Sequence, residues 1–209
     1  DGTTDSCDVP VVVSGISNAI KIGLGSYHTC AVLDNKSVQC WGRNNYGQLG
    51  NGETTSAQDN TSIPATLVET QDVKDVDAKG ISTCAVLDNK SVQCWGRNEY
   101  GQLGNGITGG SSSIPVIVSG ISNATKITNG YRHACVILDN KSVQCWGRNN
   151  QGQLGDGTFV DRNVPTAVTG VKNVVEIAPG YRHTCALLDN ATVQCWGQNN
   201  QGQLGDGTT

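Results

Sequence analysis

One block of sequence recurs four times along this chain and constrains its fold more than any other feature. In the first copy the block reads Cys-Ala-Val-Leu-Asp-Asn-Lys-Ser-Val-Gln-Cys-Trp-Gly over residues 30–42 and ends in Gly-Gln-Leu-Gly over residues 47–50. The other copies begin at Cys84, Cys135 and Cys185. Repeats of about 50 residues are typical of solenoids and propellers, in which each repeat is one supersecondary unit that packs on its neighbours.

Short apolar stretches within each unit predict β-strands. In the first unit they cover residues 9–13, 19–22, 30–33 and 38–41, and Pro10 makes the first of them an edge strand. No stretch combines a helical period with helix caps. We therefore expect an all-β architecture that forms one repeat array over residues 1–209. The predicted unit hairpins cover residues 27–50, 81–104, 132–155 and 182–205.

The composition suits an array of small interfaces better than one large core. Hydrophobic residues make up 36% of the chain, with one Phe and no Met. The net charge of −4 argues against a nucleic-acid partner. No apolar run is long enough to span a bilayer, so we expect no membrane insertion. The chain has no initiator Met, and Asp-Gly-Thr-Thr stands at both ends, so we expect a processed chain or a segment of a longer array.

The two cysteines of each unit are spaced to meet across a hairpin. A three-residue loop over residues 34–36, as a type I turn with a bulge, places Cys30 opposite Cys40 in a non-hydrogen-bonded pair. Such pairs have Cα atoms about 4.5 Å apart, within reach of a disulfide. The same register predicts four bridges: Cys30–Cys40, Cys84–Cys94, Cys135–Cys145 and Cys185–Cys195. Four bridges predict an extracellular or cell-surface location.

Two other interpretations of the cysteines are weaker. In a reduced cytosolic protein the thiols would simply pack. A zinc site needs further Cys or His ligands at short spacing, and these are missing. His28, His133 and His183 precede their cysteines by two residues, but Ser82 stands at that position in the second unit. We therefore interpret the histidines as polar residues at a strand start and expect no metal or cofactor.

Cys7 stands outside the repeated spacing. An odd cysteine in a secreted protein predicts a disulfide to another chain. A buried thiol and a partner beyond the given sequence are the alternatives.

Six Asn-x-Ser/Thr sequons offer glycosylation sites, and four of them fall at the predicted hairpin tips. Because Asp-Asn is also good turn chemistry, a purely structural role is the alternative. The Gly-Asp-Gly-Thr sequences at residues 155–158 and 205–208 supply too few carboxylates for calcium and are interpreted as turns. The sequons are Asn35, Asn60, Asn89, Asn123, Asn140 and Asn190.

Aromatic residues recur once per unit and also occupy the loops. The four tryptophans at positions 41, 95, 146 and 196 are expected to pack between units rather than to form a ligand platform. Loop tyrosines and neighbouring arginines are better candidates for surface contacts. The candidate contact residues are Tyr27, Tyr46, Tyr100, Tyr131, Arg132, Tyr181 and Arg182.

The block over residues 30–52 resembles the repeat of the regulator of chromosome condensation family, with Trp-Gly at 41–42 and Gly-Gln-Leu-Gly at 47–50. The resemblance recurs four times and implies β-propeller blades of antiparallel strands, usually seven in a ring. Four repeats are then part of a larger ring or array. The cysteine pairs are foreign to the nuclear member, and no exchange-factor loop or basic chromatin patch is recognisable, so the chain looks closer to secreted or surface members.

Three hypotheses about function follow. The first is a non-catalytic structural protein of the cell surface that assembles with itself and is stiffened by one disulfide per blade. The second is an extracellular binding module, an inhibitor or adhesin, that uses loop residues on one face. The third, a nucleotide-exchange factor, has the least support. No Ser, His and Asp trio stands at a selective spacing, so we expect no enzyme and no catalytic residue.

Overall fold

The computed structural model describes residues 2–56 and 60–209. In these residues the chain forms fifteen strands in four antiparallel sheets, and it holds no helix that could cross a membrane. The first sheet contains β1 (Ala19–Leu24), β2 (His28–Leu33), β3 (Val38–Gly42) and β4 (Thr61–Thr66). The second contains β5 (Val73–Lys79), β6 (Ser82–Leu87), β7 (Val92–Arg97) and β8 (Ser111–Ile117). The third contains β9 (Ala124–Asn129), β10 (His133–Leu138), β11 (Val143–Gly147) and β12 (Arg162–Ala167). The fourth contains β13 (Val174–Pro179), β14 (His183–Leu188) and β15 (Val193–Gly197).

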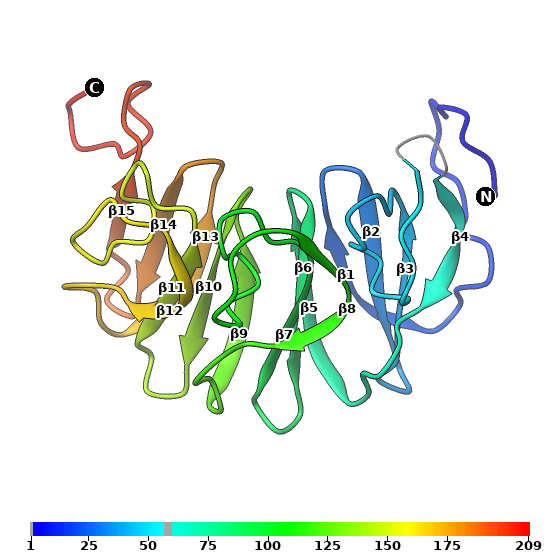
Figure 1. The fold of residues 1–209 in the computed structure, drawn as a ribbon. Helices are drawn as coiled ribbons and strands as arrows, with labels where there is room; N and C mark the ends of the chain where they lie inside the picture. The colour runs from blue at the N-terminus through cyan, green and yellow to red at the C-terminus, as the bar shows by residue number, and fades with distance from the viewer. Residues whose placement is uncertain (1, 57–59) are drawn as a thin grey trace.

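The sheets stand side by side as blades along an open arc (Figure 1). Each blade follows the chain from its first strand to its last, and the first strands, β1, β5, β9 and β13, line a shared hollow. The described N-terminal and C-terminal segments lie at opposite ends of the arc (Figure 1). The predicted all-β fold of antiparallel propeller blades is confirmed.

The β2–β3 hairpin has the register that its turn predicts. The Leu33 amide donates to the Ser37 carbonyl at 2.9 Å, and Lys36 takes the left-handed conformation with φ of 64°. This bulged turn aligns Val32 with Val38 and Cys30 with Cys40. The other three units repeat the register, with Lys90, Lys141 and Ala191 in the left-handed position.

In the described part of the chain three apolar clusters form the core, one at each junction between neighbouring blades. The cluster of the first junction joins Val32, Val38 and Leu49 of the first blade to Val76 and Trp95 of the second. The other two clusters repeat this composition at the second and third junctions. The low apolar content is therefore sufficient, since each blade buries its faces against its neighbours instead of around one centre.

The edge strand predicted over residues 9–13 is wrong: the structure shows no strand there. Val9 is 64% exposed and Val12 84% exposed. The same pattern with a central proline does form strands at β4, β8 and β12, where each pairs with the third strand of its own blade. The physical reason is that a strand needs a free edge to pair with, and the edge of β15 lies at the other end of the arc.

Candidate functional site

A disulfide joins the second and third strands of every blade. The four bridges are Cys30–Cys40, Cys84–Cys94, Cys135–Cys145 and Cys185–Cys195, each with its Cα atoms 4.1 Å apart. The first three pairs are fully buried at the junctions between blades. Each bridge crosses the middle of a hairpin, so it holds the two strands that carry the loops of one face.

The Gly-Gln-Leu-Gly loop of each blade receives the tryptophan of the next blade. At the first junction the Gln48 carbonyl accepts hydrogen bonds from the Trp95 indole at 3.0 Å and from the Thr83 hydroxyl at 3.0 Å. The His28 Nε2 lies 2.8 Å from the same hydroxyl. Because that hydroxyl already donates its proton to Gln48, His28 must donate from Nε2. Trp95 and Trp146 are fully buried, as expected of residues that pack between blades.

His28 therefore links the first blade to the second, a role that sequence reasoning missed. His133 and Thr184 repeat the link at 2.9 Å at the third junction. At the second junction Ser82 and Ala134 stand in the two places, so histidine and threonine are lost together. The sequence does carry a signal of this link, because the histidine of one repeat and the threonine of the next repeat are replaced together.

Burial keeps these two histidines neutral. It lowers the pKa of His28 to about 4 and the pKa of His133 to about 3. In both rings Nδ1 is buried with no hydrogen-bond partner among the described residues, so a proton added there would meet no acceptor. A glycine lies against each ring: a Cβ on Gly25 would come within 2.1 Å of the His28 ring.

Tyrosine and arginine side chains gather at one end of the blades. The turns between first and second strands and the loops after the third strands meet there, since Arg43 bonds through its amide to the Tyr27 carbonyl at 2.8 Å. All five tyrosines and five of the six arginines of the chain make contacts in this set, which we call the Tyr–Arg face. Its members are Tyr27, Arg43, Tyr46, Arg97, Tyr100, Tyr131, Arg132, Arg148, Tyr181 and Arg182.

The largest group in the face spans the last three blades. Arg132 and Arg148 stack on the Tyr100 ring, with 4.9 and 4.6 Å from guanidinium carbon to ring centroid. Arg132 also donates to the Tyr100 hydroxyl at 2.8 Å. The rings of Tyr131 and Tyr181 stack with their centroids 4.3 Å apart. Further pairs are Arg43 over Tyr27 at 5.5 Å and Arg97 over Tyr46 at 4.9 Å.

The structure thus brings the predicted contact residues together and adds three arginines that the sequence did not single out, Arg43, Arg97 and Arg148. Arg97 pairs with Glu99. Within residues 2–56 and 60–209 the other four arginines of the face form no ion pair with a carboxylate. The buried Nε atoms of Arg43 and Arg182 also have no acceptor among the described residues. The face therefore holds positive charge that an acidic group can neutralise.

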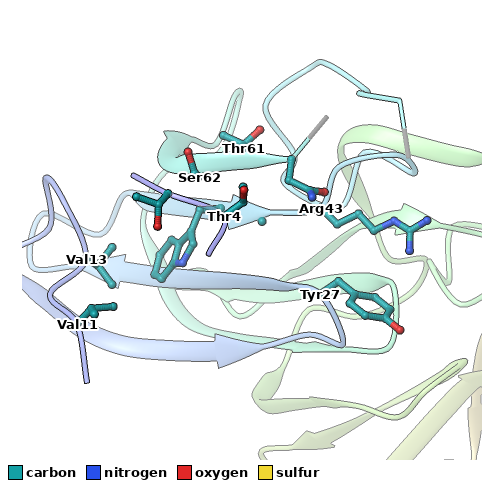
Figure 2. A pocket seen from close by; sticks show the side chains of 11 residues that line it. Thr4, Val11, Val13, Tyr27, Arg43, Thr61 and Ser62 are labelled. Carbon is teal, nitrogen blue, oxygen red and sulfur yellow. The ribbon is translucent and has the colours of Figure 1, made fainter. Parts of the chain in front are cut away.

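The hairpin tips lie at the opposite end of the blades from the Tyr–Arg face. The sequon residues Asn35, Asn89, Asn140 and Asn190 are exposed there, and each accepts hydrogen bonds from the residue two places on. These Asx turns support the structural interpretation of the Asp-Asn sequence. Of the other two sequons, Asn60 is exposed before β4 and lines a cavity together with Tyr27 and Arg43 of the Tyr–Arg face (Figure 2), and Asn123 is half-buried before β9.

The remaining candidates lie apart from this face. Cys7 is exposed, which rules out the buried thiol, and its Sγ lies 3.9 Å from the Asp5 carbonyl. The Asp156 carboxylate is occupied by Thr158, Asn149 and Arg162, as expected of a turn. Within the described ranges no three His, Cys, Asp or Glu side chains gather as metal ligands would.

Two family models match the repeat. The first, named Regulator of chromosome condensation (RCC1) repeat, matches residues 37–86, 91–137 and 142–187. A second form of the same repeat matches over residues 19–48, 73–102, 124–153 and 174–203. These segments together cover more than half of the chain.

Known proteins show the same likeness. The Ultraviolet-B receptor UVR8 of Arabidopsis thaliana is 32% identical over 156 residues, which are 73% of this chain and 34% of that protein. The E3 ubiquitin-protein ligase HERC2 of Homo sapiens is 28% identical over 169 residues, 75% of this chain and 3% of that protein. The chain thus spans about a third or less of these relatives. The structure of yeast RCC1 (Prp20) bound to Kap60 superposes with a TM-score of 0.80 at 19% identity and covers 96% of this chain and 48% of that one. With the repeat matched in all four blades, the chain belongs to the regulator of chromosome condensation (RCC1) repeat family.

Proposed function

We propose that this chain is a non-catalytic, extracellular binding module that recognises an acidic protein segment through its Tyr–Arg face. The observation that carries the proposal is the gathering of all five tyrosines and five of six arginines at one end of the blades. Of the functions that the sequence allows, this geometry favours the binding module over a purely structural role.

The residue types suit protein recognition. Tyrosine and arginine are enriched among the residues that contribute most to binding at protein interfaces. Stacking on Tyr100 holds the guanidinium groups of Arg132 and Arg148 in place, so less side-chain entropy is lost when a carboxylate binds. The blades that carry the loops are stiffened by disulfides, which again limits the entropy lost on binding.

The disulfides also support the extracellular location. Four bridges in one chain are typical of an oxidising compartment. The exposed sequons at the hairpin tips lie at the other end of the blades, so glycans there would leave the Tyr–Arg face open. Yeast RCC1 (Prp20), which has this fold, is bound to the protein Kap60 in the matched structure.

Selection of displayed peptides on the oxidised protein tests the proposal. We expect the selected peptides to be enriched in Asp and Glu, and their affinity to fall as salt rises. The double variant Arg132→Ala with Arg148→Ala should weaken a selected peptide by at least tenfold, or about 1.4 kcal/mol, in a direct binding measurement.

A matched control separates the face from net charge. The double variant Lys74→Ala with Lys172→Ala also removes two positive charges, from exposed positions that are not part of the face, and should leave the affinity unchanged. Peptides without acidic enrichment, or equal binding by wild type and the double variant with unchanged melting temperature, would refute the proposal.

A further inference from the structure

The third blade exposes an apolar pair in the loop between β11 and β12. Phe159, the one phenylalanine of the chain, is 74% exposed, and Val160 is 60% exposed. This blade has four strands and packs against a neighbouring blade on each side. The pair is therefore exposed within a complete blade, and its exposure does not come from an adjacent repeat that the sequence lacks.

The fold of this loop does not require an aromatic residue. The position of Phe159, two residues after the glycine that follows the Gly-Gln-Leu-Gly block, is threonine in the other three units. In the first unit threonine also follows at the position of Val160. Because the pair is exposed and threonine serves in its place elsewhere, packing within the blade does not explain it. The three threonines at the position of Phe159 are Thr54, Thr108 and Thr209.

Hydrogen bonds hold the apolar pair beside an arginine of the Tyr–Arg face. Arg148, which stacks on the Tyr100 ring, is followed directly by Asn149. The Asn149 backbone amide donates to the Asp161 carboxylate at 2.6 Å, and its side-chain amide donates to the Val160 carbonyl at 3.1 Å. The segment that carries the apolar pair is thus fixed to the residue next to Arg148.

The same segment also contacts the loop that carries Tyr100. A Cβ on Gly101, the residue after Tyr100, would come within 2.6 Å of the Asn163 Cα. The Asn163 side chain donates to the Gly106 carbonyl at 2.8 Å, and the Gly106 amide donates to the Asn163 carbonyl at 2.8 Å. Ile107, which follows Gly106, is 60% exposed. The two blades that hold the Tyr100 group therefore both present apolar side chains in the loops next to it.

The carboxylates of the third-blade loop do not neutralise the stacked arginines. Asp156 accepts a hydrogen bond from Arg162 at 2.8 Å, and Asp161 is held by the backbone amide described above. Within the described ranges Arg132 and Arg148 form no ion pair. An apolar surface next to unpaired guanidinium groups is complementary to a ligand that combines an apolar side chain with a carboxylate.

We propose that the acidic segment bound by the Tyr–Arg face also carries an apolar side chain, which packs on Phe159 and Val160 while a neighbouring carboxylate lies against the stacked arginines. This inference rests on the proposed function and names its class of partner, a protein segment in which an aliphatic or aromatic residue stands close to Asp or Glu. The apolar contact keeps water away from the charged contact beside it. It also discriminates against acidic segments without an apolar residue, because these would leave Phe159 exposed to water.

Peptide selection on two forms of the oxidised protein tests the apolar contact. The double variant Phe159→Thr with Val160→Thr installs the residues of the first unit, so its loop should still fold. Peptides selected on wild type should be enriched in an apolar residue at a fixed spacing from their acidic residues. Peptides selected on the variant should keep the acidic residues and lose the apolar one. A peptide selected on wild type should bind the variant at least tenfold more weakly, by the same factor at low and high salt.

A matched control and a change in the peptide exclude an indirect effect. The double variant Ile117→Thr with Val175→Thr removes two exposed apolar side chains near the hairpin tips, at the other end of the blades, and should leave the affinity unchanged. Replacing the apolar residue of the peptide by Ser should weaken its binding to wild type at least tenfold. The same change should weaken binding to the Phe159 variant by almost nothing, because the contact is already lost.

The two enrichments separate this inference from the proposed function. Acidic enrichment without an apolar position, or equal affinity of wild type and the Phe159 variant for a selected peptide, would overturn the apolar contact and leave the acidic-binding face in place. Selected peptides that are apolar but not acidic would instead count against the proposed function, and with it against a partner that combines the two.

Discussion

The buried histidines predict that this propeller loses stability between pH 7 and pH 5. Burial lowers the pKa of His28 to about 4 and of His133 to about 3, against 6.5 for an exposed histidine. Above pH 6.5 both the folded and the unfolded chain hold these rings neutral, so they contribute no pH dependence. Below pH 6.5 these histidines bind protons in the unfolded chain but not in the folded chain, so the free energy of unfolding falls as pH falls.

The magnitude follows from these values. At pH 5 the loss is about 2 kcal/mol for each histidine, or about 4 kcal/mol for the two. Asp77 acts in the opposite direction. Burial raises its pKa to about 6, so the folded chain takes up a proton first as pH falls and regains about 1 kcal/mol by pH 5. The net expected loss is about 3 kcal/mol.

Urea unfolding of the oxidised protein, followed by tryptophan fluorescence at pH 7, 6 and 5, measures this slope. The double variant His28→Gln with His133→Gln should be less stable than wild type at pH 7, but its free energy of unfolding should rise by about 1 kcal/mol between pH 7 and pH 5, because Asp77 remains. Asp77→Asn should steepen the loss by about 1 kcal/mol, because it removes the opposing group. If the double variant falls with pH as steeply as wild type, the histidines do not carry the effect and the reasoning is refuted.

Three further predictions test the junctions and the bridges. Leu103→Ala should lower the free energy of unfolding by about 2–5 kcal/mol, because Leu103 is fully buried. Leu204→Ala should lower it by only about 1 kcal/mol, because Leu204 is half-buried. Equal losses in urea unfolding would contradict the junction cores. Replacing Cys135 and Cys145 by Ser should cost about 3 kcal/mol by the loop-entropy estimate, measured by calorimetry without reductant, and an unchanged melting temperature would count against a stiffening role. Ser82→His should destabilise the second junction, because Lys79 stands at the position where Gly25 lies against the His28 ring at the first. Adding Lys79→Gly and Ala134→Thr should restore about 1 kcal/mol or more of the free energy of unfolding, since histidine then has a threonine to bond. No rise in melting temperature on adding the two changes would refute the link.

The hairpins and their disulfides could be predicted because their determinants are local. A bulged three-residue loop sets the register, and the register places Cys30 opposite Cys40 whatever the rest of the chain does. The all-β class and the junction role of Trp95 followed from the repeat for the same reason. The strand predicted at residues 9–13 failed because pairing depends on a partner edge far away in space, about which a local pattern says nothing.

The Tyr–Arg face could be predicted only in part. Sequence reasoning chose the tyrosines and the arginines next to them, such as Arg132, but Arg148 reaches the Tyr100 ring from a different blade. A contact between residues almost one repeat apart depends on how adjacent blades are set against each other, and that is decided by the junction cores. The repeat would have supplied the missing arginines, because Arg43, Arg97 and Arg148 occupy one position of the unit.

At the blade junctions, residues that contact each other across two repeats also vary together in the sequence. Where His28 occurs, glycine lies under the ring and threonine receives its Nε2 in the next blade. At the second junction all three places differ together, as Lys79, Ser82 and Ala134. Any one of these changes alone would leave a clash or a buried polar group without its partner, so they are tolerated only as a set. Four copies of one unit therefore give the comparison that an alignment of relatives normally provides, and positions that vary together one repeat apart indicate which residues meet across a junction.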